Sequence, residues 1–155
     1  MLNLKKRLEI YFSGRFGVDS DFWKNYNVYL LGNSIWLTSY NLEPKYKNIS
    51  CGLRALRIKD SELKGLKPTT YILQYLDNHI KTNIVDVGKD DLKKLFNGEY
   101  LENNSLDNGY VALRYKGYII GCGMKNSSGV KNQIPKKRAK QLEKIIDKNY
   151  QTEDR

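Results

Sequence analysis

The stretch from Tyr110 to Met124 constrains the fold most, because it has the pattern of a β-hairpin. Two runs of alternating side chains flank the dipeptide Lys116-Gly117, which suits a tight turn. On the second run, Gly121 and Gly123 leave room for a bend or for the close approach of another backbone. The sequence therefore predicts an antiparallel hairpin over these residues.

The positive charge of the chain is concentrated in and after this hairpin. The 155 residues include 27 Lys and Arg against 17 Asp and Glu, which gives a formal net charge of +10. Positions 110–142 contain no Asp or Glu but eight cations: Arg114, Lys116, Lys125, Lys131, Lys136, Lys137, Arg138 and Lys140. Such a surplus attracts polyanions over a Debye length of about 8 Å. Nucleic acid is the favoured partner, an anionic membrane surface comes next, and a Lys-rich surface that only maintains solubility is the alternative.

The other segments alternate between helical and extended patterns. Apolar spacing predicts helices around residues 4–12, 20–26, 69–80, 90–96 and 139–146, and strands at 28–40 (a hairpin), 51–58 and 83–87. A turn at Ser127-Ser128-Gly129 leads to the segment VKNQIP before the last helix. Ser13-Gly14 is expected to end the first helix, and Lys67-Pro68 to break the chain. Asp19 or Ser20 can cap the second helix, and Thr69 or Thr70 the third.

Residues that carry catalysis or bind metals are scarce. Cys51 and Cys122 lie far apart in apolar stretches and His79 is the single histidine, so buried reduced thiols are a better interpretation than a zinc site. The glycines of GCGMKNSSG interrupt a hairpin and make a weak match to a cofactor-binding loop. No leader peptide or membrane span is evident. We expect a cytoplasmic protein without catalytic residues, metal or cofactor.

The segment GYVALRYKGYIIGCGMKNSSGVKNQIPKKR resembles the C-terminal PUA-like domain of Fmu/Sun-type RNA cytosine-5 methyltransferases. The matching positions are Gly117, Gly121, Gly123, Lys131, Asn132, Pro135, Lys136 and Arg138. Upstream, the shorter pieces RFG (15–17), GLRALR (52–57), LKPT (66–69) and NGEYL (97–101) look like an archaeal stand-alone version, labelled a ribosome-biogenesis protein, that lacks the catalytic domain.

This resemblance implies an α+β protein, with a small α+β domain at residues 1–67 and a PUA-like β-barrel with flanking helices at residues 68–155. It also implies non-catalytic binding of structured rRNA or tRNA during maturation or modification, with an RNA-modifying enzyme as a further partner. The alternatives are a protein–protein adaptor that docks its basic face on an acidic partner, such as a methyltransferase subunit, and an enzyme of unrecognised activity.

The predicted RNA-binding surface combines the cations with polar and aromatic side chains. It comprises Arg114, Lys116, Tyr118, Lys125, Lys131, Asn132, Lys136, Lys137 and Arg138. Tyr118 can stack on an unpaired base, although a tyrosine on a strand more often simply packs. Arg15 and Arg54 are weaker candidates, because a partly buried arginine paired with a carboxylate explains each equally well.

Overall fold

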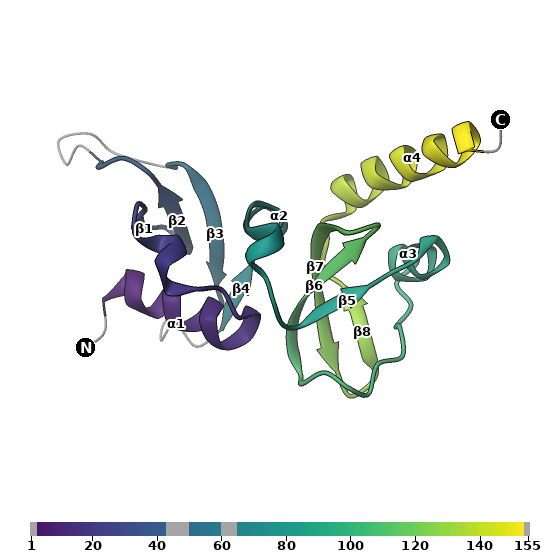
Figure 1. The fold of residues 1–155 in the computed structure, drawn as a ribbon, viewed down its shortest axis with the longest axis horizontal. Helices are drawn as coiled ribbons and strands as arrows, with labels where there is room; N and C mark the ends of the chain where they lie inside the picture. The colour runs from purple at the N-terminus through teal and green to yellow at the C-terminus, as the bar shows by residue number, and fades with distance from the viewer. Residues whose placement is uncertain (1–2, 43–49, 60–64, 154–155) are drawn as a thin grey trace.

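The computed structural model describes residues 3–42, 50–59 and 65–153, and these form two four-stranded sheets with helices around them (Figure 1). The elements are α1 Leu4–Phe16, η1 Ser20–Trp23, β1 Asn27–Leu31, β2 Ser34–Thr38, β3 Leu53–Ile58, β4 Leu66–Pro68, α2 Thr70–Leu76, η2 Asp77–His79, β5 Ile84–Asp86, α3 Lys89–Phe96, β6 Gly109–Tyr115, β7 Tyr118–Asn126, β8 Gly129–Asn132 and α4 Lys136–Glu153. The predicted α+β class is confirmed.

The first sheet is an antiparallel meander in the order β1-β2-β3-β4. One face of α1 is buried, because Leu8, Phe12 and Phe16 recur at intervals of four residues. Phe12 packs on Trp23 with 5.2 Å between the ring centroids, and both side chains are fully buried. The aromatic side chains of α1 and η1 thus form the centre of this core.

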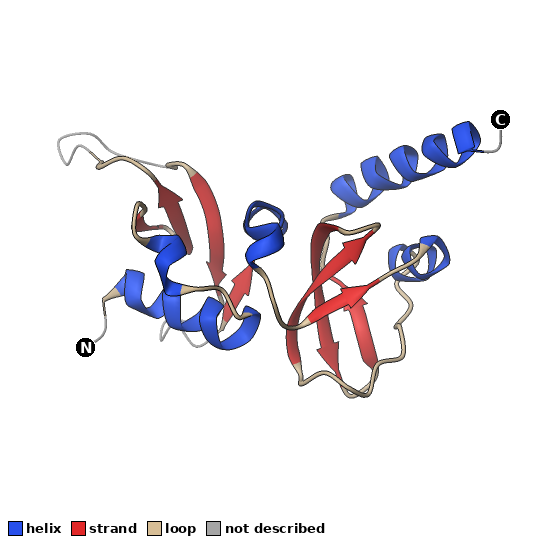
Figure 2. Ribbon diagram, viewed as in Figure 1, coloured by secondary structure: helices blue, strands red, loops and turns tan. Residues whose placement is uncertain are grey.

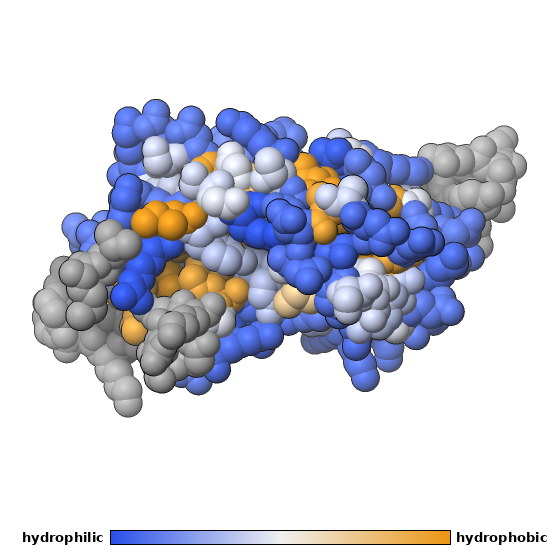
Figure 3. All heavy atoms as spheres, turned by 90° about the horizontal axis from the view of Figure 1, so that it is seen from below, coloured by the Kyte–Doolittle hydropathy of each residue, from blue (hydrophilic) through white to orange (hydrophobic). Residues whose placement is uncertain are grey.

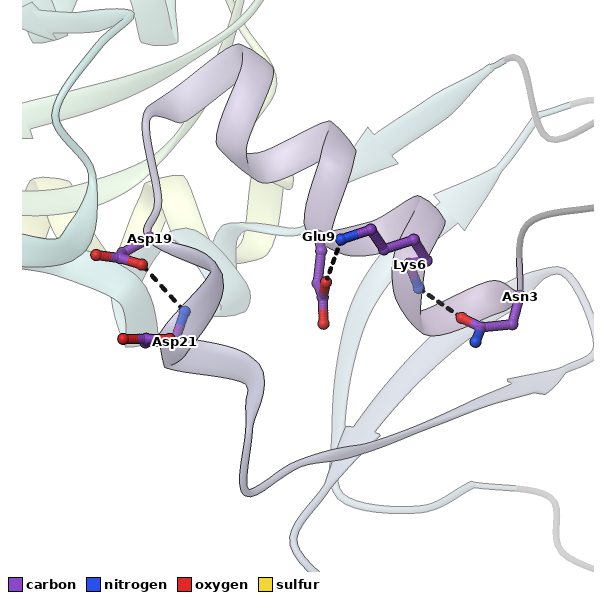
Figure 4. A network of polar contacts seen from close by, with 5 residues as sticks. All are labelled: Asn3, Lys6, Glu9, Asp19 and Asp21. Atoms are coloured by element: carbon purple, nitrogen blue, oxygen red, sulfur yellow. Dashed lines mark hydrogen bonds and ion pairs between the residues drawn. The ribbon is translucent and has the colours of Figure 1, made fainter.

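The starts of α1 and η1 are fixed by side-chain caps (Figure 4). Asn3 Oδ1 accepts from the amide of Lys6 at 2.8 Å, and Asp19 Oδ1 accepts from the amide of Asp21 at 3.1 Å. Each cap satisfies an amide that has no partner inside its helix. The predicted cap at Asp19 is therefore confirmed, although the helix that follows is a short 3₁₀ turn.

The second sheet has the order β5-β6-β7-β8, with β5 parallel to β6 and the other pairs antiparallel. The hairpin predicted at 110–124 is present as β6 and β7. Its turn residues Lys116 and Gly117 have φ of 48° and 83°, the positive values that a tight two-residue hairpin turn requires. The pairings among the described strands do not show a closed barrel, and the PUA-like barrel stays a prediction.

Helix α2 lies between the two sheets and contacts both β7 and β3 (Figures 1 and 2). Thr69 caps it, as predicted, by accepting from the amide of Ile72 at 3.2 Å. Ile72 and Leu76 of α2 and Ala112 of β6 are buried in the same core cluster as Leu8 and Phe12 of α1. The larger core thus contains side chains from both sides of the predicted boundary at residue 67, and the division into two domains stays a prediction.

Two predicted chain breaks are wrong. Helix α1 continues through Ser13-Gly14 to Phe16, because Phe16 is fully buried, and it ends at Gly17 with a φ of 66°. Lys67-Pro68 is part of β4 rather than a break. Pro68 is the last residue of this edge strand, a position that tolerates the missing amide proton of proline.

Cys51 and Cys122 are both buried and unpaired, as predicted. Burial raises the pKa of Cys122 to about 12, so its thiol is protonated at neutral pH and is a poor nucleophile. None of the helices among the described residues combines the length and apolar character that crossing a bilayer demands. The face shown in Figure 3 is mostly hydrophilic, and its apolar residues gather in small separate groups.

Candidate nucleic-acid interface

The basic segment, residues 131–138, comprises the end of β8, a turn and the start of α4, and its turn is hydrogen-bonded to β7. Asn132 Oδ1 accepts from the amide of Ile134 at 2.8 Å, and the amide of Gln133 donates to the carbonyl of Cys122 at 2.9 Å. Ile134 is buried beneath this turn, where a Cβ on Gly121 would come within 2.4 Å of its side chain. The close approach at Gly121 is thus made by the side chain of Ile134 rather than by a backbone, and Asn132 has a structural role that its predicted role did not include.

Three cations of the basic segment face solvent. Lys131, Lys136 and Lys137 are exposed, and Lys131 Nζ lies 5.8 Å from the centroid of the Tyr100 ring. Lys131 and Lys136 also line a hollow of about 350 Å³ beside the end of α3. The hydrogen-bonded turn between β8 and α4 therefore has exposed cations on both sides.

Arg138 differs from its neighbours in the basic segment. Its side chain is half-buried, and its Nε has no hydrogen-bond partner among the described residues. Arg138 Nη1 donates to Gln141 Oε1 at 3.5 Å, a long contact. Part of this guanidinium is therefore covered by protein, and it presents less of its charge than the three lysines.

Two cations predicted to face RNA are engaged within the second sheet. Lys125 is only 7% exposed, and its Nζ donates to the carbonyl of Asn126 at 2.7 Å. Arg114 donates from Nε and Nη2 to the two carboxylate oxygens of Asp86 at 2.6 and 2.8 Å. The fork of hydrogen bonds from Arg114 lowers the pKa of Asp86 below its ordinary value. Lys125 is thus covered, which corrects the exposed position expected for it, and the charge of Arg114 is compensated.

Lys116 and Tyr118, at the tip of the hairpin, are exposed to solvent. Tyr118 is 71% exposed, and Lys116 Nζ lies 5.7 Å from the centroid of the Tyr115 ring. Because β8 runs antiparallel to β7 and Asn132 is opposite Gly123, the chain after Asn132 continues toward the tip end of β7. The tip and the basic segment are therefore directed to the same end of the sheet.

Arg15 is a structural connection between the two halves of the molecule. Its Nε donates to the carbonyl of Tyr110 at 2.6 Å, and its terminal nitrogens donate to the carbonyls of Asn108 and Asp107 at 3.3 and 3.1 Å. The guanidinium also lies against Gly109, where a Cβ would be 3.0 Å from Arg15 Cζ. The donors of Arg15 are thus directed at backbone carbonyls of its own chain.

Arg54 belongs to a site that the sequence did not reveal. It lines a pocket of about 400 Å³, here called the Trp36 pocket, between β2, β3, β4, the start of α2 and the basic segment. The side chains that matter for its chemistry are Trp36, Arg54, Arg57, Lys67, Tyr71 and Gln133. No acidic side chain is among the described residues that line it. The pocket therefore combines three cations with two aromatic rings.

A β-bulge brings the two arginines of this pocket together. Arg54 and Arg57 are three residues apart, so regular alternation would place them on opposite faces of β3. Trp36 is opposite Arg54, while the preceding residue Ile35 is opposite Leu56, which leaves Ala55 as an extra residue. After the bulge, both arginines lie on the same face as Trp36.

The Trp36 pocket and the basic segment form one continuous surface. Gln133 and Pro135 line both the Trp36 pocket and the hollow that contains Lys131 and Lys136. Across this shared wall, Lys67 Nζ donates to Gln133 Oε1 at 2.7 Å. A polyanion that crosses this wall can therefore contact cations on both sides of it.

The described residues contain no cluster of three or more His, Cys, Asp or Glu side chains that could hold a metal ion. The functional groups of this surface are instead cationic nitrogens, amides and aromatic rings. Such groups bind phosphates and stack on bases.

Part of the chain is similar to known ribosomal RNA methyltransferases. Residues 82–139 match the family model described as the Methyltransferase RsmF PUA domain. The ribosomal RNA small subunit methyltransferase F of Vibrio vulnificus (strain YJ016) is 26% identical over 122 residues, which cover 79% of this chain and 25% of that protein. The protein of the same name from Vibrio atlanticus (strain LGP32) is 28% identical over 123 residues, with the same coverage.

The chain spans about a quarter of the length of these curated relatives. The matched region includes the hairpin of β6 and β7, β8 and the basic segment. The motif that carried the resemblance in the sequence thus lies inside the region that the family model matches, and residues 82–139 are similar to the PUA-like domain of the Fmu/Sun-type methyltransferases.

Proposed function

We propose that this protein binds RNA through the basic segment and takes part in the modification or maturation of ribosomal RNA without catalysing the chemistry itself. The observation that carries the proposal is the exposure of Lys131 in β8 and of Lys136 and Lys137 at the start of α4, on either side of a hydrogen-bonded turn of the PUA-like domain. The relatives are small subunit ribosomal RNA methyltransferases by name, which supports ribosomal RNA as the partner. A transfer RNA is the second RNA to test.

The proposal assigns different weights to the predicted contacts. Lys131, Lys136 and Lys137 would neutralise phosphates, while Lys116 and Tyr118 would extend the surface at the hairpin tip. Arg114 contributes less because Asp86 compensates its charge, and Lys125 contributes through packing because it is buried. Partial burial likewise limits Arg138.

The test is a titration of the protein with a small subunit rRNA fragment and with tRNA at several salt concentrations. We expect the triple variant Lys131→Ala/Lys136→Ala/Lys137→Ala to bind on the order of 100-fold more weakly at physiological salt. Each phosphate contact contributes about 0.7 to 0.9 to the log–log salt slope, so the slope should flatten by roughly two to three.

The matched control is Lys6→Ala/Lys24→Ala/Lys81→Ala, which removes the same charge from exposed positions outside the basic segment and the Trp36 pocket. Equal losses in the two variants would mean that net charge alone drives the binding. A wild-type protein that binds no better than an unrelated protein of the same charge would refute the RNA proposal. Retention of an acidic protein partner after nuclease treatment would then favour the adaptor function.

A further inference from the structure

The Trp36 pocket places cations beside one another, with no acidic side chain among the described residues that line it. Arg57 of β3 and Lys67 of β4 are direct cross-strand partners, and Lys67 is half-buried. Like charges in such positions destabilise a sheet. Burial lowers the pKa of Lys67, and the nearby Lys59 and Arg57 lower it further. A bound anion would relieve this repulsion.

The hydrogen-bond partner of Lys67 among the described residues carries no charge. Lys67 Nζ donates to the side-chain oxygen of Gln133, a neutral amide. This contact positions the ammonium group at the wall that the pocket shares with the basic segment. No acidic side chain among the described residues that line the pocket pairs with Lys67, and a phosphate could take that place.

The aromatic side chains give the pocket a second kind of binding surface. The guanidinium carbon of Arg54 lies 5.1 Å from the centroid of the Trp36 ring, so the guanidinium covers one face of the indole. Tyr71, at the start of α2, lines the same pocket and is 56% exposed. Bases stack on aromatic rings and on arginine planes of this kind.

Unpaired polar atoms are also concentrated here. Trp36 Nε1, Arg54 Nε and Thr70 Oγ1 are buried without a hydrogen-bond partner among the described residues, and all three belong to side chains that line the pocket. Unsatisfied groups of this kind are rare in native proteins and often mark a site that water or a ligand completes. The volume of about 400 Å³ is within the range of small-molecule sites.

We propose that the Trp36 pocket holds one unstacked nucleotide of a single-stranded RNA segment, its base against Tyr71 and Arg54 and its phosphate between Arg57 and Lys67. This deepens the proposed function and rests on it. The RNA would continue from the pocket over Gln133 and Pro135 to Lys131 and Lys136, so that one strand contacts both the pocket and the basic segment. An enzyme that modifies the RNA would then meet a strand whose stacking is already interrupted.

Tryptophan fluorescence tests the proposal, because the other tryptophan, Trp23, is fully buried in the aromatic core. The probes are a short oligouridylate, a duplex RNA hairpin and free uridine monophosphate. We expect saturable quenching by the oligouridylate, little by the duplex, and loss of the signal in Trp36→Phe. Saturable quenching by the free mononucleotide with none by the oligouridylate would overturn the RNA assignment in favour of a free nucleotide.

Two pairs of variants locate the contacts. Tyr71→Ala should weaken oligouridylate binding roughly 10-fold, whereas Tyr71→Phe should bind as the wild type does, because the ring supplies the stacking. Arg57→Ala/Lys67→Ala should also weaken binding about 10-fold and flatten the salt slope by roughly 1.4. Its control, Lys93→Ala/Lys94→Ala, removes two exposed cations of α3.

The outcomes separate this proposal from the proposed function. If the rRNA fragment binds and depends on the lysines of the basic segment, but none of the pocket variants affects the oligouridylate or the fluorescence, the pocket proposal is wrong and the RNA function stands. If neither RNA binds and Trp36 fluorescence does not respond, both are wrong. Thermal unfolding of each variant shows whether a lost signal reflects a lost fold.

Discussion

Replacement of Gly129 by alanine is expected to destabilise the protein by more than about 4 kcal/mol. Gly129 has a φ of 120°, a conformation that side-chain-bearing residues rarely adopt, and a Cβ there would lie 2.2 Å from the carbonyl oxygen of Leu101. That carbonyl accepts from the amide of Val130 at 2.8 Å, and the amide of Leu101 donates back at 2.9 Å. The alanine would therefore combine backbone strain with the loss of this bridge.

Urea unfolding measures the effect, and Gly14→Ala is its control. Gly14 lies inside α1, and no atom is within 4 Å of the position its Cβ would take. Alanine at this position should stabilise the protein by roughly 0.5 to 1 kcal/mol, because it favours the helix. A Gly129→Ala protein that unfolds within about 1 kcal/mol of the wild type would contradict the geometry described for the Leu101 bridge.

Arg15→Ala is expected to cost about 3 kcal/mol, and to lower the melting temperature by roughly 6 to 12 °C. The largest part is the charged hydrogen bond from Arg15 Nε to the carbonyl of Tyr110, because Tyr110 is buried at the start of β6. Water can replace the contacts to the more exposed Asn108 and Asp107 carbonyls. Calorimetry of the variant measures the change.

The control on the same helix is Lys6→Ala. Lys6 forms an exposed ion pair with Glu9 at 3.4 Å, and such pairs contribute about 0.2 to 1 kcal/mol or less. At a temperature where Arg15→Ala is folded, its RNA affinity should match that of the wild type. Similar melting temperatures for the two variants, or a selective loss of RNA binding by Arg15→Ala, would contradict a structural role for Arg15.

The parts of the fold that local chemistry determines could be predicted from the sequence. Lys116-Gly117 marked the hairpin turn, and Thr69 and Asp19 marked two helix starts, because these signals act within a few residues. The end of α1 could not be predicted in this way. Burial of Phe16 in the aromatic core outweighs the cost of glycine inside the helix, and that core depends on distant residues.

The candidate site was only partly predictable, because burial and pairing depend on tertiary structure. The lysines of the basic segment could be identified from charge alone, but the cover over Lys125 and the partner of Arg114 could not. The Trp36 pocket had no recognisable signal. Its two arginines share a face because of the bulge at Ala55. Its Lys67 lies in a strand where Pro68 had led us to predict a chain break.

The most direct test of the RNA-binding surface is amide chemical-shift mapping of the protein with a small subunit rRNA fragment. We expect the perturbed amides to cluster at residues 52–57, 67–71 and 131–138, the segments that form the Trp36 pocket and the basic segment. Helix α1 and η1, at residues 4–23, should change little, because none of their residues lines the Trp36 pocket or the hollow beside the basic segment. Perturbations centred on α1 and η1, or none near residues 131–138, would contradict this surface as the place where RNA binds.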